Sequence, residues 1–127
     1  MLLNTEPLAA DEKILKSLQL VYKGSTHSLS VSKDTHMLEG DKGYISFADI
    51  NFDGLADIAI TTSFGLGNLY LDYWVYDSVN NQYNFLGNFS KFTLSPADKT
   101  LSNVVKLNAV NYENYTYHWQ GLSLVKQ

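Results

Sequence analysis

The sequence predicts an all-β single domain of about eight or nine antiparallel strands, arranged as a sandwich or a propeller-like sheet. The chain has 127 residues, which suits one domain with one core. Apolar residues make up 45% and charged residues 17%, a composition typical of a globular protein. Short apolar runs alternate with Gly, Asn, Asp and Pro, the rhythm of antiparallel β folds. A complete propeller of four-stranded blades would need a longer chain.

The strands are expected to follow a polar start, residues 1–12, which we predict to be loosely ordered. Residues 14–22 suit a helix or a strand, and their ending in Leu, Val and Tyr favours a strand. Residues 27–33 alternate between apolar and serine positions, as a half-buried strand does. Further strands are predicted over 43–50, 57–64, 68–77, 83–87, 89–96, 101–110 and 115–126.

Residues 68–77, "NLYLDYWVYD", form the clearest predicted strand. Both of its faces are largely apolar or aromatic, which predicts a central strand covered on both sides, or one whose second face meets a partner. Residues 78–82, "SVNNQ", follow and predict a hairpin turn, because Asn tolerates the left-handed backbone that such turns need.

Charge and cysteine content disfavour several classes of function. The formal net charge of −4 gives no basic field for nucleic acid or anionic lipid. The chain has no cysteine, which excludes disulfides, thiol nucleophiles and thiolate metal ligands. The N-terminal residues do not form a signal peptide, and no apolar run has membrane-spanning length. An exported protein whose leader had been removed would look the same.

The stretch "DINFDGLAD", residues 49–57, predicts a calcium site. Calcium takes six to eight oxygen ligands, and a compact loop can supply most of them from alternate positions. Gly54 lies where such a loop must turn sharply. The predicted ligands are the side chains of Asp49, Asn51, Asp53 and Asp57 and the carbonyl oxygen of Leu55.

The same stretch has two alternative interpretations, an EF-hand and a hairpin turn without an ion. An EF-hand would need a bidentate Glu at loop position 12, where this chain has Ile60. The second alternative is an acidic hairpin turn without an ion, in which each side chain binds local backbone amides. The spacing together with the glycine favours calcium, in a structural role rather than a catalytic one.

The remaining side chains give no catalytic pattern. His27, His36 and His118 lie in different segments without zinc spacing. No nucleophile and base pair can be named, so the sequence predicts a protein that is not an enzyme. The "ENYTYHWQG" segment places Tyr115, Tyr117 and Trp119 on one strand face, more typical of sheet packing than of a binding surface.

The pattern DxNxDGxxD between two strands resembles the calcium loops of FG-GAP and VCBS-type repeats. The order of "ADINFDGLADIAI", "GLGN", "YLDYWVYD", "FSKFTLSP" and "YHWQGLSLV" over residues 47–125 is also similar to a family of bacterial periplasmic calcium-binding β proteins. Some members of that family are lysozyme inhibitors or immunity proteins. The resemblance implies a Ca²⁺ cofactor, a periplasmic location, and a peptidoglycan hydrolase or lysozyme-like effector of rival bacteria as the partner, blocked sterically.

Two segments are candidates for contact with such a partner. The first is the glycine-rich "SFGLGN" segment leading into a tyrosine, although an ordinary loop remains the alternative. The second is "NYENYTY", residues 111–117, where Glu113 adds a charge that suits a basic lysozyme surface. The candidate contact residues are Phe64, Gly65, Leu66, Gly67, Asn68, Tyr70, Tyr115 and Tyr117. A calcium-stabilised adhesion or surface-recognition module that binds protein or carbohydrate is the alternative function.

Overall fold

The computed structural model describes residues 2–9, 12–38, 45–65 and 68–127, and they form an all-β fold. Eleven strands are present, against the eight or nine expected. They are β1 (Leu2–Ala9), β2 (Glu12–Tyr22), β3 (Ser25–Leu38), β4 (Ile45–Ala48), β5 (Asp57–Gly65), β6 (Asn68–Asp77), β7 (Gln82–Ser90), β8 (Thr93–Ser95), β9 (Thr100–Lys106), β10 (Tyr112–Gln120) and β11 (Ser123–Lys126). Within the described part of the chain, no helix has the length and apolarity that a membrane crossing requires.

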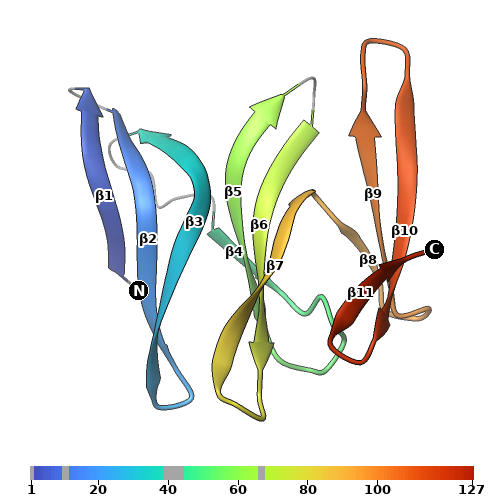
Figure 1. Cartoon of the computed structure of the whole chain (residues 1–127), viewed down its shortest axis with the longest axis horizontal. Helices are drawn as coiled ribbons and strands as arrows, with labels where there is room; N and C mark the ends of the chain where they lie inside the picture. Colours follow the sequence, from blue (N-terminus) through green and yellow to red (C-terminus); the bar gives the residue numbers. More distant parts are fainter. Residues whose placement is uncertain (1, 10–11, 39–44, 66–67) are drawn as a thin grey trace.

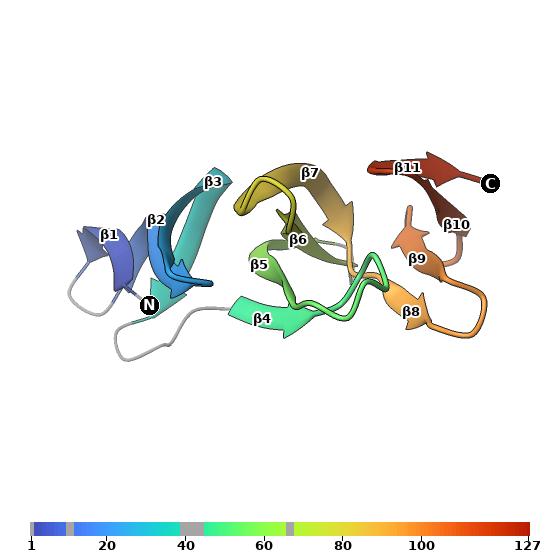
Figure 2. The same cartoon turned by 90° about the horizontal axis from the view of Figure 1, so that it is seen from below.

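The strands form three antiparallel sheets that lie side by side in chain order (Figures 1 and 2). The first sheet contains β1 to β3, the middle sheet β4 to β7, and the third sheet β8 to β11. In each sheet, strands that follow one another in sequence are hydrogen-bonded neighbours. The architecture is therefore a row of three meanders, which agrees with the propeller-like alternative more closely than with a two-layer sandwich.

The middle sheet is covered on both faces, as predicted for residues 68–77. One hydrophobic cluster joins it to the first sheet, with Leu18 opposite Ile58 and Ile60 as fully buried members. A second cluster joins it to the third sheet and includes Tyr73, Phe92 and Leu101. Strand β6 contributes to both clusters because its successive side chains point to opposite faces.

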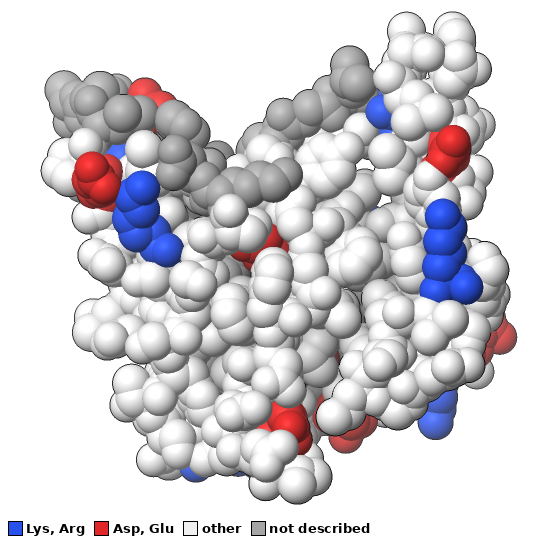
Figure 3. Space-filling model, viewed as in Figure 1, with Lys and Arg blue, Asp and Glu red and all other residues white. Residues whose placement is uncertain are grey.

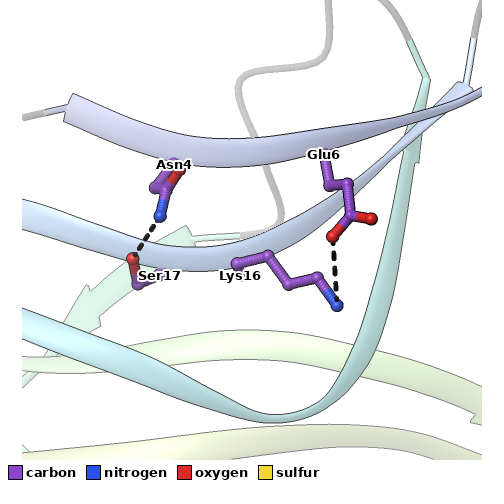
Figure 4. A network of polar contacts seen from close by, with 4 residues as sticks. All are labelled: Asn4, Glu6, Lys16 and Ser17. Carbon is purple, nitrogen blue, oxygen red and sulfur yellow. Dashed lines mark hydrogen bonds and ion pairs between the residues drawn. The ribbon is translucent and has the colours of Figure 1, made fainter.

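The start of the chain differs from the loosely ordered segment that was expected over residues 1–12. Leu2–Ala9 form strand β1, which pairs antiparallel with β2. Two exposed side-chain contacts accompany this pairing, from Asn4 Nδ2 to Ser17 Oγ at 3.3 Å and from Lys16 Nζ to Glu6 Oε2 at 3.7 Å (Figure 4). Residues 2–9 show no two-residue alternation and include a proline, so the sequence did not reveal the backbone pairing that orders them.

Two predicted strands are divided in the structure. Residues 89–96 split into the end of β7 and the short β8, because the chain turns between them and the Phe92 amide donates to Tyr73 Oη at 2.9 Å. Residues 115–126 split into β10 and β11 at Gly121, whose φ of 60° allows the tight turn. Strand β9 ends at Lys106, four residues before the predicted end at Val110.

Candidate functional site

The acidic loop, residues 49–57, connects β4 to β5 and is held by apolar side chains between the sheets. Ile50 is fully buried in the cluster between the middle and third sheets, and Phe52 packs against that cluster. Leu55 packs instead against the cluster between the first and middle sheets. The apolar residues of the loop therefore point into the protein. Because they alternate with the polar residues, their packing also holds the polar residues in place.

Three of the predicted ligands lie together at the turn of this loop. Asp49 accepts the backbone amides of Asp53 at 3.1 Å and of Gly54 at 2.8 Å, one on each carboxylate oxygen. Asp53 accepts the Leu55 amide at 2.9 Å and the Asn51 side-chain amide at 3.2 Å. Both carboxylates therefore stabilise the turn by accepting hydrogen bonds from neighbouring residues of the loop.

Asn51 carries an atom that the folded loop leaves unsatisfied. Its side-chain oxygen Oδ1 is buried and has no hydrogen-bond partner, although its Nδ2 donates to Asp53. A buried carbonyl oxygen without a partner costs about 1–3 kcal/mol relative to a satisfied one. The loop also holds Phe52 at a φ of 59°, a left-handed conformation that bulky side chains rarely adopt. Gly54 has a φ of 85°, which its lack of a side chain permits.

Asp57 has a different environment from the other two aspartates. It is 1% exposed, and its two oxygens accept the backbone amides of Ile50 and Tyr76, both at 2.9 Å. Burial raises the pKa of its carboxyl from 3.8 to about 6, against the two backbone hydrogen bonds that lower it. The nearby carboxylates of Asp53 and Asp49 raise the pKa further. Asp57 ties the loop to strand β6.

The structure therefore brings Asp49, Asn51 and Asp53 together and directs Asp57 toward the backbone of the loop and of β6. Among the described residues, no group of three acidic or histidine side chains is placed to hold a metal ion by itself. Leu55 follows directly after the turn, so its carbonyl belongs to the same short segment.

The acidic loop also contacts the third sheet through Trp119 of β10. The indole Nε1 of Trp119 donates to the Ile50 carbonyl oxygen at 2.8 Å. Asn51 and Trp119 line a cleft between the middle and third sheets, together with Asp77 and Leu122. The loop is consequently an element that links two sheets as well as a turn between two strands.

The glycine-rich candidate segment lies at the β5–β6 hairpin, and only part of it is described. Leu66 and Gly67 lie outside the described residues, and Phe64 and Gly65 are described as strand backbone only. Asn68 is buried, and its side chain donates to the Lys106 carbonyl at 2.9 Å and accepts the Lys106 amide at 2.8 Å. Asn68 thus joins this hairpin to the end of β9. Tyr70, also named as a contact residue, is half-buried.

The two tyrosines proposed for the second contact segment take different roles. Tyr117 packs against Phe89 and Phe92 in the cluster between the middle and third sheets, so it belongs to the core. The hydroxyl of Tyr115 donates to Glu113, and Lys126 Nζ lies 3.8 Å from the centre of the Tyr115 ring. The prediction that these tyrosines contribute to sheet packing is therefore confirmed for Tyr117.

The sequence indicated residues 111–117 of the β9–β10 hairpin as a contact segment, but not the exposed apolar turn that precedes them. Residues 106–112, here called the β9–β10 tip, carry large apolar side chains in solvent. Val110 is 81% exposed and Tyr112 is 61% exposed, and Leu107 is about half exposed. The apolar residues of "LNAVNY" fall among asparagines, a pattern that indicates an exposed apolar turn. The strand that we predict over this segment instead extends as far as residue 110.

Comparison of the chain with protein-family models, with curated proteins and with solved structures gives no match, so the site stands on its own geometry.

Proposed function

We propose that this protein is a calcium-stabilised binding protein that blocks a peptidoglycan-cleaving, lysozyme-like enzyme, as an inhibitor or immunity protein. The observation that carries the calcium part is the unpartnered, buried Oδ1 of Asn51, which lies in a turn shared with the carboxylates of Asp49 and Asp53. An oxygen left without a donor by the fold is what a cation would satisfy.

The donor set fits calcium in its chemistry. All the predicted ligands are oxygens, as a hard cation prefers, and bound calcium would offset the repulsion between the clustered carboxylates. Asp49, Asn51, Asp53 and the Leu55 carbonyl would hold the ion. Asp57 remains the fifth candidate, because a carboxylate oxygen that accepts one amide retains a second lone pair. Waters would complete the coordination.

The partner part rests on the family resemblance together with the arrangement of the sheets. The acidic loop joins β4 to β5 and binds the third sheet through Trp119, so calcium there would stabilise a scaffold rather than a reaction centre. Hairpin ends on such a scaffold can occupy an enzyme cleft without any bond being made or broken. The inhibitor would reside in the periplasm, where such effectors act.

An adhesion or surface-recognition module is the second candidate. The row of three meanders in chain order favours it, since stacked repeats of one supersecondary unit build extended binding surfaces. In that case the ligand would be a surface protein or a carbohydrate, and the calcium loop would keep the same structural role.

Inhibition assays test the proposal directly. The full chain, with millimolar Ca²⁺ or with EDTA, would be added to c-type, g-type and i-type lysozymes and to bacterial muramidases acting on purified peptidoglycan. We expect stoichiometric inhibition of at least one enzyme, weaker in EDTA, and no cleavage of peptidoglycan by the chain alone. Binding to intact cell surfaces without inhibition of any of these enzymes would favour the adhesion module instead.

A further inference from the structure

The β9–β10 tip is a rigid apolar projection. Within it, the amides of Leu107 and Asn108 both donate to the Asn111 carbonyl, at 2.8 and 3.2 Å. The Asn108 side chain accepts the amides of Val110 and Asn111, both at 3.0 Å. These bonds fix the backbone of the turn, so the positions from which the exposed apolar side chains project are set before any partner arrives.

The tip is also fixed at its base. Asn68 of β6 binds both backbone groups of Lys106, at 2.9 and 2.8 Å. Ser90 of β7 donates to the Val104 carbonyl at 2.8 Å. Figure 1 shows the hairpin extending past the ends of the neighbouring strands, and Figure 3 shows mostly uncharged residues over this end of β9 and β10. A narrow, fixed projection of this kind suits a concave partner.

At the base of the tip, Lys106 and Tyr112 share one face of the third sheet with Val104 and Asn114. Tyr112 pairs with Lys106, and Val104 pairs with Asn114, two residues along each strand. Because side chains alternate between faces, these four point away from the middle sheet, opposite to Leu101, Asn103 and Tyr117. Lys106 is exposed on this face, and no described carboxylate forms an ion pair with it. The tip therefore combines apolar anchors with one available positive charge.

We propose that the β9–β10 tip enters the substrate cleft of the blocked enzyme, with Val110 and Tyr112 as apolar anchors and Lys106 facing the carboxylates of that cleft. This inference rests on the proposed function. Glycoside-cleaving enzymes carry a pair of carboxylates beside the scissile bond, so a cation on an apolar projection complements the cleft in charge and in shape. Buried aromatic and aliphatic anchors supply most of the affinity in such interfaces.

Paired variants of the full chain test the inference against an enzyme that the unaltered protein inhibits, taken from the c-type, g-type and i-type lysozymes and the bacterial muramidases. Val110→Asp should weaken binding at least ~30-fold, the effect of losing one hot-spot residue. Val79→Asp is the matched control, since Val79 is 90% exposed in the β6–β7 turn, and binding should change less than about 2-fold. Lys106→Glu should weaken binding ~10-fold, and less in high salt. Melting curves verify that each variant is folded.

Competition with a saccharide locates the contact on the enzyme. Chitotriose, which occupies the glycan cleft of such enzymes, should displace the unaltered chain. If the chain inhibits but Val110→Asp and Lys106→Glu bind as the unaltered chain does, or chitotriose does not compete, the tip inference is overturned and the proposed function stands. If the unaltered chain inhibits none of these enzymes, the proposed function fails and the inference fails with it.

Discussion

Two turns of this molecule are built from Asp and Asn, and they differ in whether their polar atoms are satisfied. In residues 77–81, between β6 and β7, Asp77 accepts the amides of Val79 and Asn80 and the side-chain amide of Asn80, at 3.0, 3.3 and 2.7 Å. Asn81 accepts from the Tyr76 hydroxyl and donates to Ser25, at 2.6 and 2.7 Å. The hydrogen bond from the Asn80 side chain is the largest cause that lowers the Asp77 pKa.

The acidic loop contains more hydrogen-bond acceptor atoms than the amide groups of the loop can satisfy. It places three aspartates within nine residues, holds Phe52 in a left-handed conformation, and leaves Asn51 Oδ1 without a partner. The same residue types therefore satisfy one turn and leave the other with a buried acceptor that has no partner. The first is a complete Asx turn, whereas we propose that a cation completes the second.

The largest expected effect concerns Asp57, the one aspartate of the acidic loop that is buried and that binds a backbone amide of strand β6. Asp57→Ala leaves the buried amides of Ile50 and Tyr76 without an acceptor, which should lower the free energy of unfolding by about 4 kcal/mol in EDTA, and by more in Ca²⁺ because a candidate ligand is also lost. Urea unfolding in EDTA and in Ca²⁺ measures this. Asp98→Ala, at an exposed Ser95 contact, is the control and should cost under about 0.5 kcal/mol. A loss below about 1 kcal/mol for Asp57→Ala would contradict this role.

Titration of Asp57 should give the next largest effect. Its pKa of about 6 in the folded protein lies above the unfolded value of 3.8, so the folded state binds the proton more tightly. The resulting stability is fully present below about pH 4 and is lost as pH rises through about 6, a fall of about 3 kcal/mol. Unfolding in EDTA from pH 4 to 7 should show this fall relative to Asp57→Ala, in which the other carboxylates titrate unchanged. Parallel pH profiles for the two proteins would exclude it.

Calcium removal tests the comparison between the two turns most directly. At free Ca²⁺ about a hundredfold above the dissociation constant, the ion should add about 2.7 kcal/mol to the free energy of unfolding, so EDTA should lower the melting temperature. Asp53→Ala should abolish this response, whereas Asp77→Ala should lower stability and keep it. If both variants respond to calcium as the unaltered chain does, the acidic loop is a turn of the same kind as residues 77–81.

Asn51→Ala should give the smallest and most specific effect. In EDTA it removes the unsatisfied Oδ1 along with an exposed hydrogen bond to Asp53, so the free energy of unfolding should rise by about 1 kcal/mol. In calcium it removes a ligand, and the affinity measured by calorimetry should fall about 10-fold. Asn80→Ala is the matched control, because it should destabilise the other turn equally in both conditions. An unchanged calcium affinity for Asn51→Ala would contradict the proposal that its Oδ1 binds calcium.

The sequence was sufficient for the fold class and for the covered central strand, because period-two patterning and two apolar faces are local signals. The order of residues 2–9 was missed because it comes from pairing with β2, a contact that no local pattern in this segment reveals. The breaks at Phe92 and Gly121 depend on a tertiary hydrogen bond and on one left-handed residue.

The candidate site was predictable in part for the same reason. Spacing alone placed Asp49, Asn51 and Asp53 in one turn, since the loop is short. Spacing could not show that Asp57 is drawn to the amide of Tyr76, 19 residues later in the chain, or that Asn68 is used in holding Lys106. Those roles are set by how the sheets pack.

The hydrogen bond from Trp119 to the Ile50 carbonyl gives this protein an internal fluorophore beside its acidic loop. The chain has two tryptophans, and replacing Trp74 with Phe would leave Trp119 as the single emitting indole. Indole emission responds to the charge and polarity around the ring, so filling of the loop should shift the spectrum of that variant. The proposed binding of calcium to the loop could then be followed by emission alone, in dilute solution and on the timescale of rapid mixing.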